Sequence, residues 1–285
     1  MAVHIFFKAL VLATKQFRLK NGWVLSSHIA MSMMLALFPF ALFTVSLAGA
    51  VTEVSAQSID IEYVLDLLFG SWPAAVADPI KGEVVAVLQN SGLRLVTFSG
   101  IVTLYFASNG VDAVRLAMVS AYREEDRRPY WKARLICVVL VILGGLGLLA
   151  AALFEVLLPL SIRYLAEQIP GMNECFVATW ENGLNGILVL TVPLAAVFVS
   201  HLALPDRLHR LTEIGAGAVF TVVLWWAAGL GFAYYVASFA QYSATYAGLA
   251  GAMVALVFLY LNAAILILGA ELNGALMSLR EEAQG

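Results

Sequence analysis

Six long runs of apolar residues constrain this 285-residue chain more than any other feature. An α-helix needs about 20 predominantly apolar residues to cross the hydrocarbon core of a bilayer. Inside that core every backbone N–H and C=O group must find a partner within the protein, a condition that a helix satisfies locally. The sequence therefore predicts an all-α integral membrane protein with six transmembrane helices. The predicted spans cover residues 23–51, 95–121, 135–158, 184–204, 214–239 and 248–272.

The composition agrees with a chain that lies largely within a lipid bilayer. Hydrophobic residues make up 62% of the sequence and charged residues 12%, whereas soluble domains carry about 25% charged residues. The net charge of −3 argues against nucleic acid as a partner, since domains that bind it are usually strongly basic. Cys137 and Cys175 form no paired metal-binding pattern, and we expect neither a metal nor a cofactor.

The distribution of Lys and Arg predicts the orientation of the spans. Thirteen of the sixteen basic residues lie in the N-terminal segment, within or beside the loops after the second and fourth spans, or in the tail. Because loops rich in Lys and Arg stay in the cytoplasm, both termini are predicted to be cytoplasmic. We expect three parts: an N-terminal segment 1–22, a transmembrane domain 23–276 and a short cytoplasmic tail 277–285.

Two segments outside the spans have amphipathic patterns. Val3, Phe6, Phe7 and Leu10 recur at helical spacing within residues 1–22, and lysines occupy other faces. This pattern predicts a helix that lies on the inner leaflet, with membrane lipids as its partners. The longest outer loop, 52–94, is acidic, and its apolar residues repeat at helical spacing in two places. We expect two short helices there that cap the outer face.

An ionisable side chain within a span is expected only where it has a structural or functional role, because inserting it at a helix centre costs on the order of 2.5–3.5 kcal/mol of free energy. In the predicted orientation they fall in the cytoplasmic half, with Glu155 as the exception. A carboxylate tends to pair with a guanidinium, whose donors satisfy both oxygens. We therefore expect Asp112, Arg115 and Glu271 to form an inward-facing cluster, either a structural clamp or a site that also contacts a substrate or proton. Its candidate members are His28, Asn109, Asp112, Arg115, Glu271 and Asn273.

Other residues predict local geometry. Pro39 should kink the first span, and the Asn109–Gly110 pair indicates a local break in the second span or a backbone that faces a cavity. The N–H groups of Trp225 and Trp226, in the middle of the fifth span, need partners or a polar cavity. Gly274 is expected to end the last helix. Close helix contact is permitted at Gly144, Gly145, Gly147, Gly229, Gly231, Gly248 and Gly251.

Several short stretches carry a resemblance to a known family. They are SHIA at 27–30, FP at 38–39, FASNG at 106–110, YRE at 122–124, YAGLAG at 246–251 and GAELN at 269–273. With these stretches the chain resembles the YihY/BrkB family of bacterial inner-membrane proteins over nearly its whole length. The resemblance implies a six-span protein of the cytoplasmic membrane. The family once carried a ribonuclease label, some members are called virulence factors, and a role in moving lipids or envelope precursors has been proposed for some relatives.

We expect transport of a lipid or another anionic amphiphile of the cell envelope, with Arg123, Arg127 and Arg128 attracting phosphate head groups. The alternative is a non-transporting scaffold, either a homo-oligomer or a partner subunit in envelope assembly. A ribonuclease is less favoured, because metal-assisted hydrolysis needs clustered ligands and the four histidines are scattered singly. We predict no catalytic residues and no enzymatic activity. His28 and Glu271 are the residues expected to take part in any proton coupling.

Overall fold

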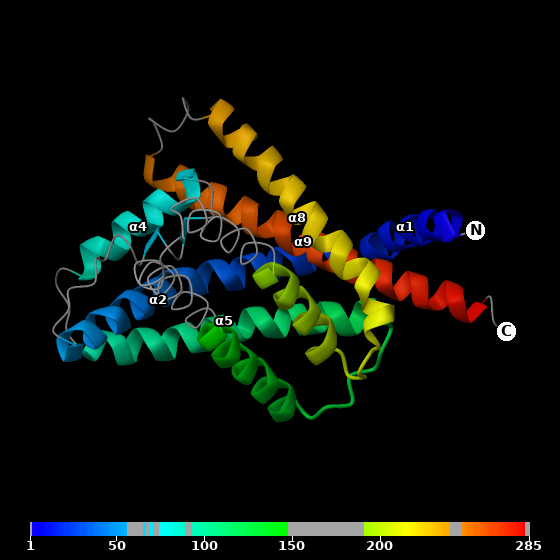
Figure 1. Ribbon diagram of the computed structural model, residues 1–285, viewed down its shortest axis with the longest axis horizontal. Helices are drawn as coiled ribbons and strands as arrows, with labels where there is room; N and C mark the ends of the chain where they lie inside the picture. Colours follow the sequence, from blue (N-terminus) through cyan, green and yellow to red (C-terminus); the bar gives the residue numbers. More distant parts are fainter. Residues whose placement is uncertain are drawn as a thin grey trace, which may run out of the picture.

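The computed structural model describes residues 2–55, 65–66, 69–70, 74–88, 93–147, 191–239 and 247–282. All regular structure in these residues is helical, which confirms the predicted all-α class for this part of the chain. Figure 1 labels α1 (Ala2–Leu19), α2 (Gly22–Ser55), α4 (Ala74–Leu88), α5 (Leu93–Ala121), α8 (Leu211–Phe239) and α9 (Ala247–Glu282). Two further helices, Tyr130–Gly147 and Thr191–Ala203, lie between α5 and α8 in the sequence.

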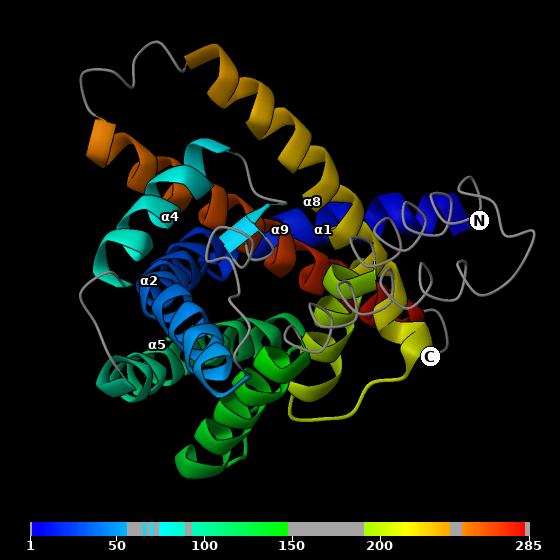
Figure 2. The same cartoon turned by 60° about the vertical axis from the view of Figure 1, so that its left-hand side comes forward.

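Helix α9 is at the centre of the packing, since it contacts α1, α2, α4, α5 and α8. Helices α2 and α5 lie side by side along much of their length (Figures 1 and 2). The largest group of buried apolar residues includes Ile29 of α2, Met118 of α5, Ile214 of α8 and Ala270 of α9. One core therefore joins these helices, and it lies toward the end of the bundle where α5 ends and α8 begins.

Four of the described helices are long and apolar enough to cross a membrane: Gly22–Phe43, Tyr130–Gly147, Leu211–Val236 and Gly251–Glu282. They coincide with the first, third, fifth and sixth predicted spans. Helix α5 matches the second predicted span in position and length, but it carries Asp112 and Arg115 and is less apolar. Residues 148–190, which hold parts of the third and fourth predicted spans, lie outside the described residues.

The two predicted helix interruptions are wrong. Helix α5 continues through Asn109–Gly110, and a Cβ on Gly110 would lie 3.6 Å from Met33 Cγ of α2, at ordinary contact distance. Helix α9 continues past Gly274 to Glu282, and a Cβ on Gly274 would strike the carbonyl oxygen of Ala121. Gly274 thus allows α9 to pack closely against the end of α5, whereas a methyl group at Gly110 would fit. Helix α2 runs through Pro39 without a break in its assignment, and the kink there stays a prediction.

Most of the glycines that permit close contact do not make one with the described part of the chain. A Cβ added at position 144, 145, 147, 229 or 231 would meet no described atom within 4 Å. The tight contact between α8 and α9 lies elsewhere: a Cβ on Gly217 would strike the carbonyl oxygen of Gly269, and one on Gly269 would strike Thr221 Oγ1. Small residues in a sequence indicate that close approach is allowed, but they do not indicate which helix face meets a neighbour.

Of the two indoles in the middle of α8, Trp226 is exposed and Trp225 is half-buried with a partner for its N–H group. Trp225 Nε1 donates a hydrogen bond to the carbonyl of Asn262 in α9 at 2.9 Å. Asn262 in turn donates through Nδ2 to the carbonyl of Phe258, one turn earlier, at 2.7 Å. Helices α8 and α9 are therefore linked by a polar contact along their apolar lengths.

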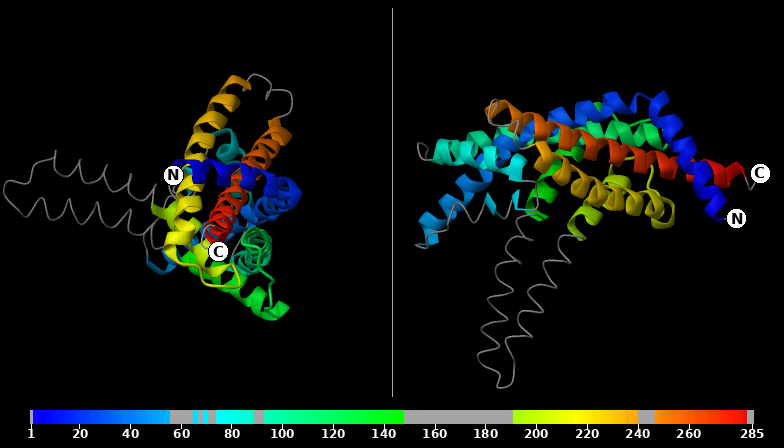
Figure 3. Two further views of the ribbon diagram at one scale, coloured as in Figure 1. Left: turned by 90° about the vertical axis from the view of Figure 1, so that its right-hand side faces the viewer. Right: turned by 90° about the horizontal axis from the view of Figure 1, so that it is seen from above.

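Helix α1 forms as predicted, but its packing face is different. Ala9 and Ala13 are buried against Leu272 of α9, whereas Phe6 and Phe7 are exposed. Small side chains allow α1 to approach α9 closely, so the phenylalanines stay on the outer side. Both chain termini lie at one end of the molecule, and α4 lies at the opposite end (Figures 1 and 3). Helix α4 accounts for one of the two expected short helices in 52–94; most of the other lies outside the described residues.

Candidate functional site

Buried polar side chains gather at the end of the bundle where two connecting loops lie. Loop 122–129 joins α5 to the helix Tyr130–Gly147, and loop 204–210 joins Thr191–Ala203 to α8. The buried charged or polar residues at this end include Arg115, His201 and Glu271. Since a buried polar group is costly without a partner, the contacts of each residue show what it can do.

Glu271 of α9 is paired with Lys20. The Lys20 Nζ atom lies 2.9 Å from Glu271 Oε1 and 3.1 Å from Oε2, and it donates to the carbonyl of Ser120 at 2.5 Å. The position of Lys20 follows from the tight turn between α1 and α2, where Asn21 has a left-handed φ of 57°. Asn is one of the few residues that adopts this conformation readily. Lys20 therefore joins the α1–α2 turn to the end of α5 and to α9.

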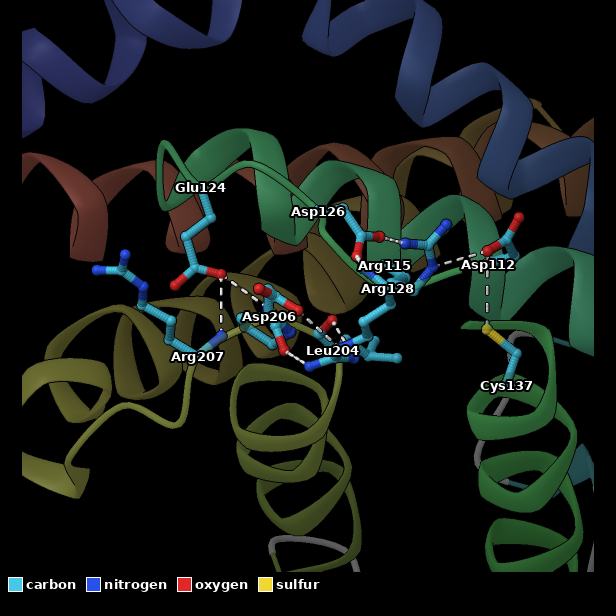
Figure 4. A network of polar contacts seen from close by, with 10 residues as sticks. Asp112, Arg115, Glu124, Asp126, Arg128, Cys137, Leu204, Asp206 and Arg207 are labelled. Carbon is cyan, nitrogen blue, oxygen red and sulfur yellow. Dashed lines mark hydrogen bonds and ion pairs between the residues drawn. The ribbon is translucent and has the colours of Figure 1, made fainter. Parts of the chain in front are cut away.

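Arg115 of α5 is paired with two other carboxylates (Figure 4). Its Nε lies 2.8 Å from Oδ1 of Asp112, one turn earlier on the same helix face, and its Nη1 contacts Asp126 of loop 122–129. The thiol of Cys137 lies 3.8 Å from the same oxygen of Asp112, so the helix Tyr130–Gly147 also meets this group. The guanidinium holds loop 122–129 against α5.

The predicted cluster is thus right for Asp112 with Arg115 and wrong for Arg115 with Glu271. Arg115 finds two acids close to it in the chain, and Glu271 takes Lys20, so each buried charge is compensated locally. His28 is exposed on α2, and Asn109 is half-buried. Within the described chain, neither residue makes a side-chain hydrogen bond or ion pair, so the structure does not bring them into the cluster.

Loop 122–129 is bound to loop 204–210 through Glu124. Helix α5 ends at Ala121; Arg123, just beyond it, has a left-handed φ of 57°, and the N–H groups of Arg123 and Glu124 return to carbonyls of the last turn. This arrangement is the Schellman motif. It places Glu124 so that its Oε2 accepts the backbone N–H groups of Asp206 at 2.7 Å and Arg207 at 3.2 Å (Figure 4).

Of the three arginines expected to attract head groups, one is occupied in the same contact. Arg128 Nε lies 3.0 Å from Asp206 Oδ1, and its terminal nitrogens contact the carbonyls of Leu204 and Pro205. Arg123 and Arg127 are exposed, and their side chains form no ion pair with any described residue. Arg128 is therefore a structural contact between the loops, whereas Arg123 and Arg127 face solvent.

Asn273 and Tyr122 form the buried floor beneath the two loops. Asn273 Oδ1 accepts the N–H of Gly217 at 2.7 Å, and its Nδ2 donates to the Ile214 carbonyl at 2.9 Å and to Tyr122 Oη at 3.2 Å. The Tyr122 hydroxyl also shares a hydrogen bond with His201 Nδ1, 2.7 Å away, in which the tautomer of the ring decides which group donates. Burial raises the pKa of Tyr122 above its usual value, so it remains a neutral donor. The polar atoms of Asn273 are all used by these structural contacts.

The ring of His209 lies on the ring of Tyr122, with centroids 4.3 Å apart and planes at 21°. Its Nε2 lies 2.9 Å from Glu124 Oε1, and its Nδ1 lies 3.7 Å from Glu213 Oε2 of α8. Among the described residues, no group of three His, Cys, Asp or Glu could hold a metal ion. We refer to the connected set as the junction network; its members are Tyr122, Glu124, Arg128, His201, Asp206, His209, Glu213 and Asn273.

Sequence reasoning missed most of the junction network. Tyr122 and Glu124 occur in the YRE stretch that carries the family resemblance, but their partners are about eighty residues further along the chain. His201 and His209 looked isolated because each is single in sequence. That the two loops meet could have been inferred from the predicted topology, because the loops after the second and fourth spans fall at the same membrane surface.

Long apolar helices and the buried ion pairs that join them together define a helical membrane protein. The family profile described as Virulence factor BrkB matches residues 13–285. The chain belongs to this BrkB/YihY family, as the short stretches in its sequence indicate.

Its relatives differ in length and share little sequence identity with it. The chain is 29% identical over 263 residues to a putative ribonuclease-like protein, YfkH, of Bacillus subtilis, covering 92% of each chain. It is 24% identical over 255 residues to a UPF0761 membrane protein of Aliivibrio salmonicida, covering 89% of this chain and 78% of that one. A UPF0761 membrane protein of Alkalilimnicola ehrlichii is 28% identical over 260 residues, with 89% and 54% covered. No solved structure matches the chain.

Proposed function

We propose that this is a six-span protein of the bacterial inner membrane, with both termini in the cytoplasm, that moves a lipid or another anionic amphiphile between leaflets. Family membership and the uneven distribution of Lys and Arg support the topology. The common position of both termini and the two basic loops at one end of the molecule agrees with it (Figure 1). The proposed activity is transport without catalysis of a chemical step.

The observation that carries the proposal is a set of arginines without acidic partners on the two joined loops. Arg123 and Arg127 of loop 122–129, and Arg207 and Arg210 of loop 204–210, are exposed, and their side chains form no ion pair with a described residue. The neighbouring Arg128 is paired with Asp206, whereas none of these four guanidinium groups lies at ion-pair distance from an acid, although Arg123 is close enough to Glu271 for their charges to interact. Guanidinium groups bind phosphate through paired hydrogen bonds, which suits an anionic head group.

The buried polar residues are not the proposed binding site for an anionic head group. Arg115, Glu271 and Asn273 already bind partners within the protein, so we assign the substrate contact that was expected of them to the exposed arginines. Aromatic side chains continue the basic surface toward the membrane: Arg134 lies 5.8 Å from the centroid of Tyr105, and Trp131 is exposed. Trp and Tyr side chains favour the level of the head groups, where a lipid would arrive.

The test is transbilayer movement of labelled lipid in liposomes that contain the purified protein. Fluorescent phosphatidylglycerol and phosphatidylcholine are compared, with chemical quenching of the outer leaflet. We expect the protein to accelerate exchange of the anionic lipid. Replacing Arg123, Arg127, Arg207 and Arg210 together by Gln should slow that exchange about tenfold, equivalent to about 1.4 kcal/mol of lost interaction.

The matched control is Arg280→Gln, which removes an exposed arginine from the last turn of α9, away from the two loops. It should leave the rate unchanged. Equal rates with and without protein would overturn the transport proposal, and a partner that co-purifies in fixed ratio would then support the scaffold alternative. Incubation of the same preparation with RNA tests the ribonuclease alternative, and we expect the RNA to stay intact.

A further inference from the structure

The loop before α8 takes its shape from loop 122–129, which supplies partners for its backbone. Glu124 Oε2 accepts the N–H groups of both Asp206 and Arg207, at 2.7 and 3.2 Å. The guanidinium of Arg128 contacts two carbonyls and one carboxylate of the same loop (Figure 4). One anionic and one cationic side chain, four residues apart, therefore satisfy donors and acceptors of the other loop.

Glu124 is flanked by two exposed arginines, one from each loop. Arg123 precedes it in the chain, and Arg207 is bound to it through its backbone N–H. The Glu124 side chain is only 8% exposed; its Oε2 is used by the two N–H groups, and its Oε1 lies 2.9 Å from Nε2 of His209. Within the described residues, this carboxylate forms no ion pair with either arginine. It holds the backbone of the second loop and leaves both guanidinium groups at the surface.

Most of the other acids near these arginines are held by other cations. Their ion pairs are Asp126 with Arg115, Asp206 with Arg128 and Glu271 with Lys20. Arg123 is close enough to Glu271 for their charges to interact, but the direct partner of that carboxylate is the lysine. Glu125 is the one exposed acid of the two loops, against four exposed arginines. The surface around Glu124 is therefore left cationic.

We propose that the two loops form one composite site for an anionic phosphodiester head group, and that Glu124 is the residue that positions Arg207 in it. This inference rests on the proposed function and names the group that is bound. Guanidinium groups held at one surface repel each other, and a phosphate that accepts hydrogen bonds from both removes that repulsion. Glu124 acts through the backbone of Arg207 and does not touch the anion.

Charge and position give opposite expectations for removal of the Glu124 carboxylate. Loss of a negative charge beside a basic surface should by itself strengthen the binding of an anion. Loss of the two N–H contacts should weaken it, because Arg207 is then no longer held in place. The composite site therefore requires that Glu124→Ala weakens anion binding, although this variant is more positive than the parent protein.

Calorimetric titration of the purified full-length protein in uncharged detergent measures this sign. The probes are dihexanoyl phosphatidylglycerol, dihexanoyl phosphatidylcholine and inorganic phosphate, and we expect the first to bind most tightly. Glu124→Ala should weaken its binding about tenfold, as expected for loss of two hydrogen bonds to a charged group. The matched control, Glu125→Gln, removes the exposed acid next in the chain and should tighten binding about twofold.

A double-variant cycle shows whether Glu124 acts through Arg207. In an Arg207→Gln background, Glu124→Ala should cause little further loss, because the side chain that it positions is gone. Equal losses in both backgrounds would reveal a general structural effect and would overturn the positioning role. If Glu124→Ala does not fold, Glu124→Gln keeps the test decisive. Its neutral oxygen accepts N–H groups more weakly, so binding should still weaken, whereas charge alone predicts tighter binding.

The remaining outcomes separate this site from transport. Unchanged or tighter binding in Glu124→Ala would refute the positioning role, even if the protein accelerates lipid exchange in liposomes. The expected losses in a protein that does not accelerate exchange would support the site and refute transport. A parent protein that binds phosphatidylglycerol no more tightly than phosphatidylcholine would overturn the composite site itself. Equally tight binding of inorganic phosphate would identify a site for free phosphate and overturn its assignment to a head group.

Discussion

Lys20 shows how one side chain can fix three elements. Its ammonium group lies at the α1–α2 turn, contacts Glu271 of α9 and caps the carbonyl of Ser120 near the end of α5. The Glu271 side chain is 3% exposed and that of Lys20 is 21% exposed. The carboxylate is therefore deprived of water, and the lysine is the cation that compensates it.

Replacing Lys20 by Met should destabilise the protein by about 2–3 kcal/mol, because it leaves a buried carboxylate without its partner. The loss stays below that of a fully buried pair, since Lys20 partly reaches solvent. The double variant Lys20→Met with Glu271→Leu should regain most of the stability, because no unpaired charge remains. Thermal unfolding in detergent, analysed as a double-mutant cycle, measures this coupling. Additive losses in the double variant would contradict it.

The sequence revealed which residues needed partners but not which partners they would find. Glu271 and Arg115 were recognised because a charge in an apolar span is costly. The predicted pairing of the two was wrong because their observed partners, Asp126 and Lys20, lie outside the predicted spans. A chain of this length brings together residues far apart in sequence, such as Lys20 and Glu271, through packing that no local pattern encodes.

At the scale of elements, the crossing of α8 and α9 depends on glycines that the sequence analysis did not select. Gly217 and Gly269 face each other, and Asn273 inserts its amide into the same contact through the N–H of Gly217. Close approach lets the amide satisfy backbone groups of α8 at a buried position. The helices themselves were predictable from apolar length, whereas the contacting face depends on neighbours from the whole bundle.

Gly217→Ala should destabilise the protein by about 1–3 kcal/mol, as expected for an overpacked contact. Its Cβ would lie 2.6 Å from Asn273 Cγ and would also strike a backbone oxygen, which cannot rotate away. Gly229→Ala in the same helix is the matched control, since nothing lies within 4 Å of its added Cβ. Thermal unfolding midpoints in detergent should fall for the first variant and hold or rise for the second. Equal midpoints would show that the contact tolerates a methyl group.

The whole molecule has two chemically different ends. One end holds the termini, loops 122–129 and 204–210 and the buried ion pairs, and the other holds α4 (Figures 1 and 3). The buried network joins helices at the first end, and apolar contacts join α2 to α4 at the other. In the orientation that we propose, the end with the termini faces the cytoplasm, because segments rich in Lys and Arg are retained there.

That orientation predicts which cysteines an impermeant reagent can reach. With Cys137 and Cys175 replaced by Ala, a single cysteine at Gly82 in α4 should react with an impermeant maleimide in intact cells whose outer membrane has been made permeable. A single cysteine at Leu208, which is 88% exposed in loop 204–210, should react only after the inner membrane is opened. Inverted membrane vesicles provide the control, because there the pattern should reverse. Labelling of both positions from the same side would contradict the proposed topology, since the molecule places them at opposite ends.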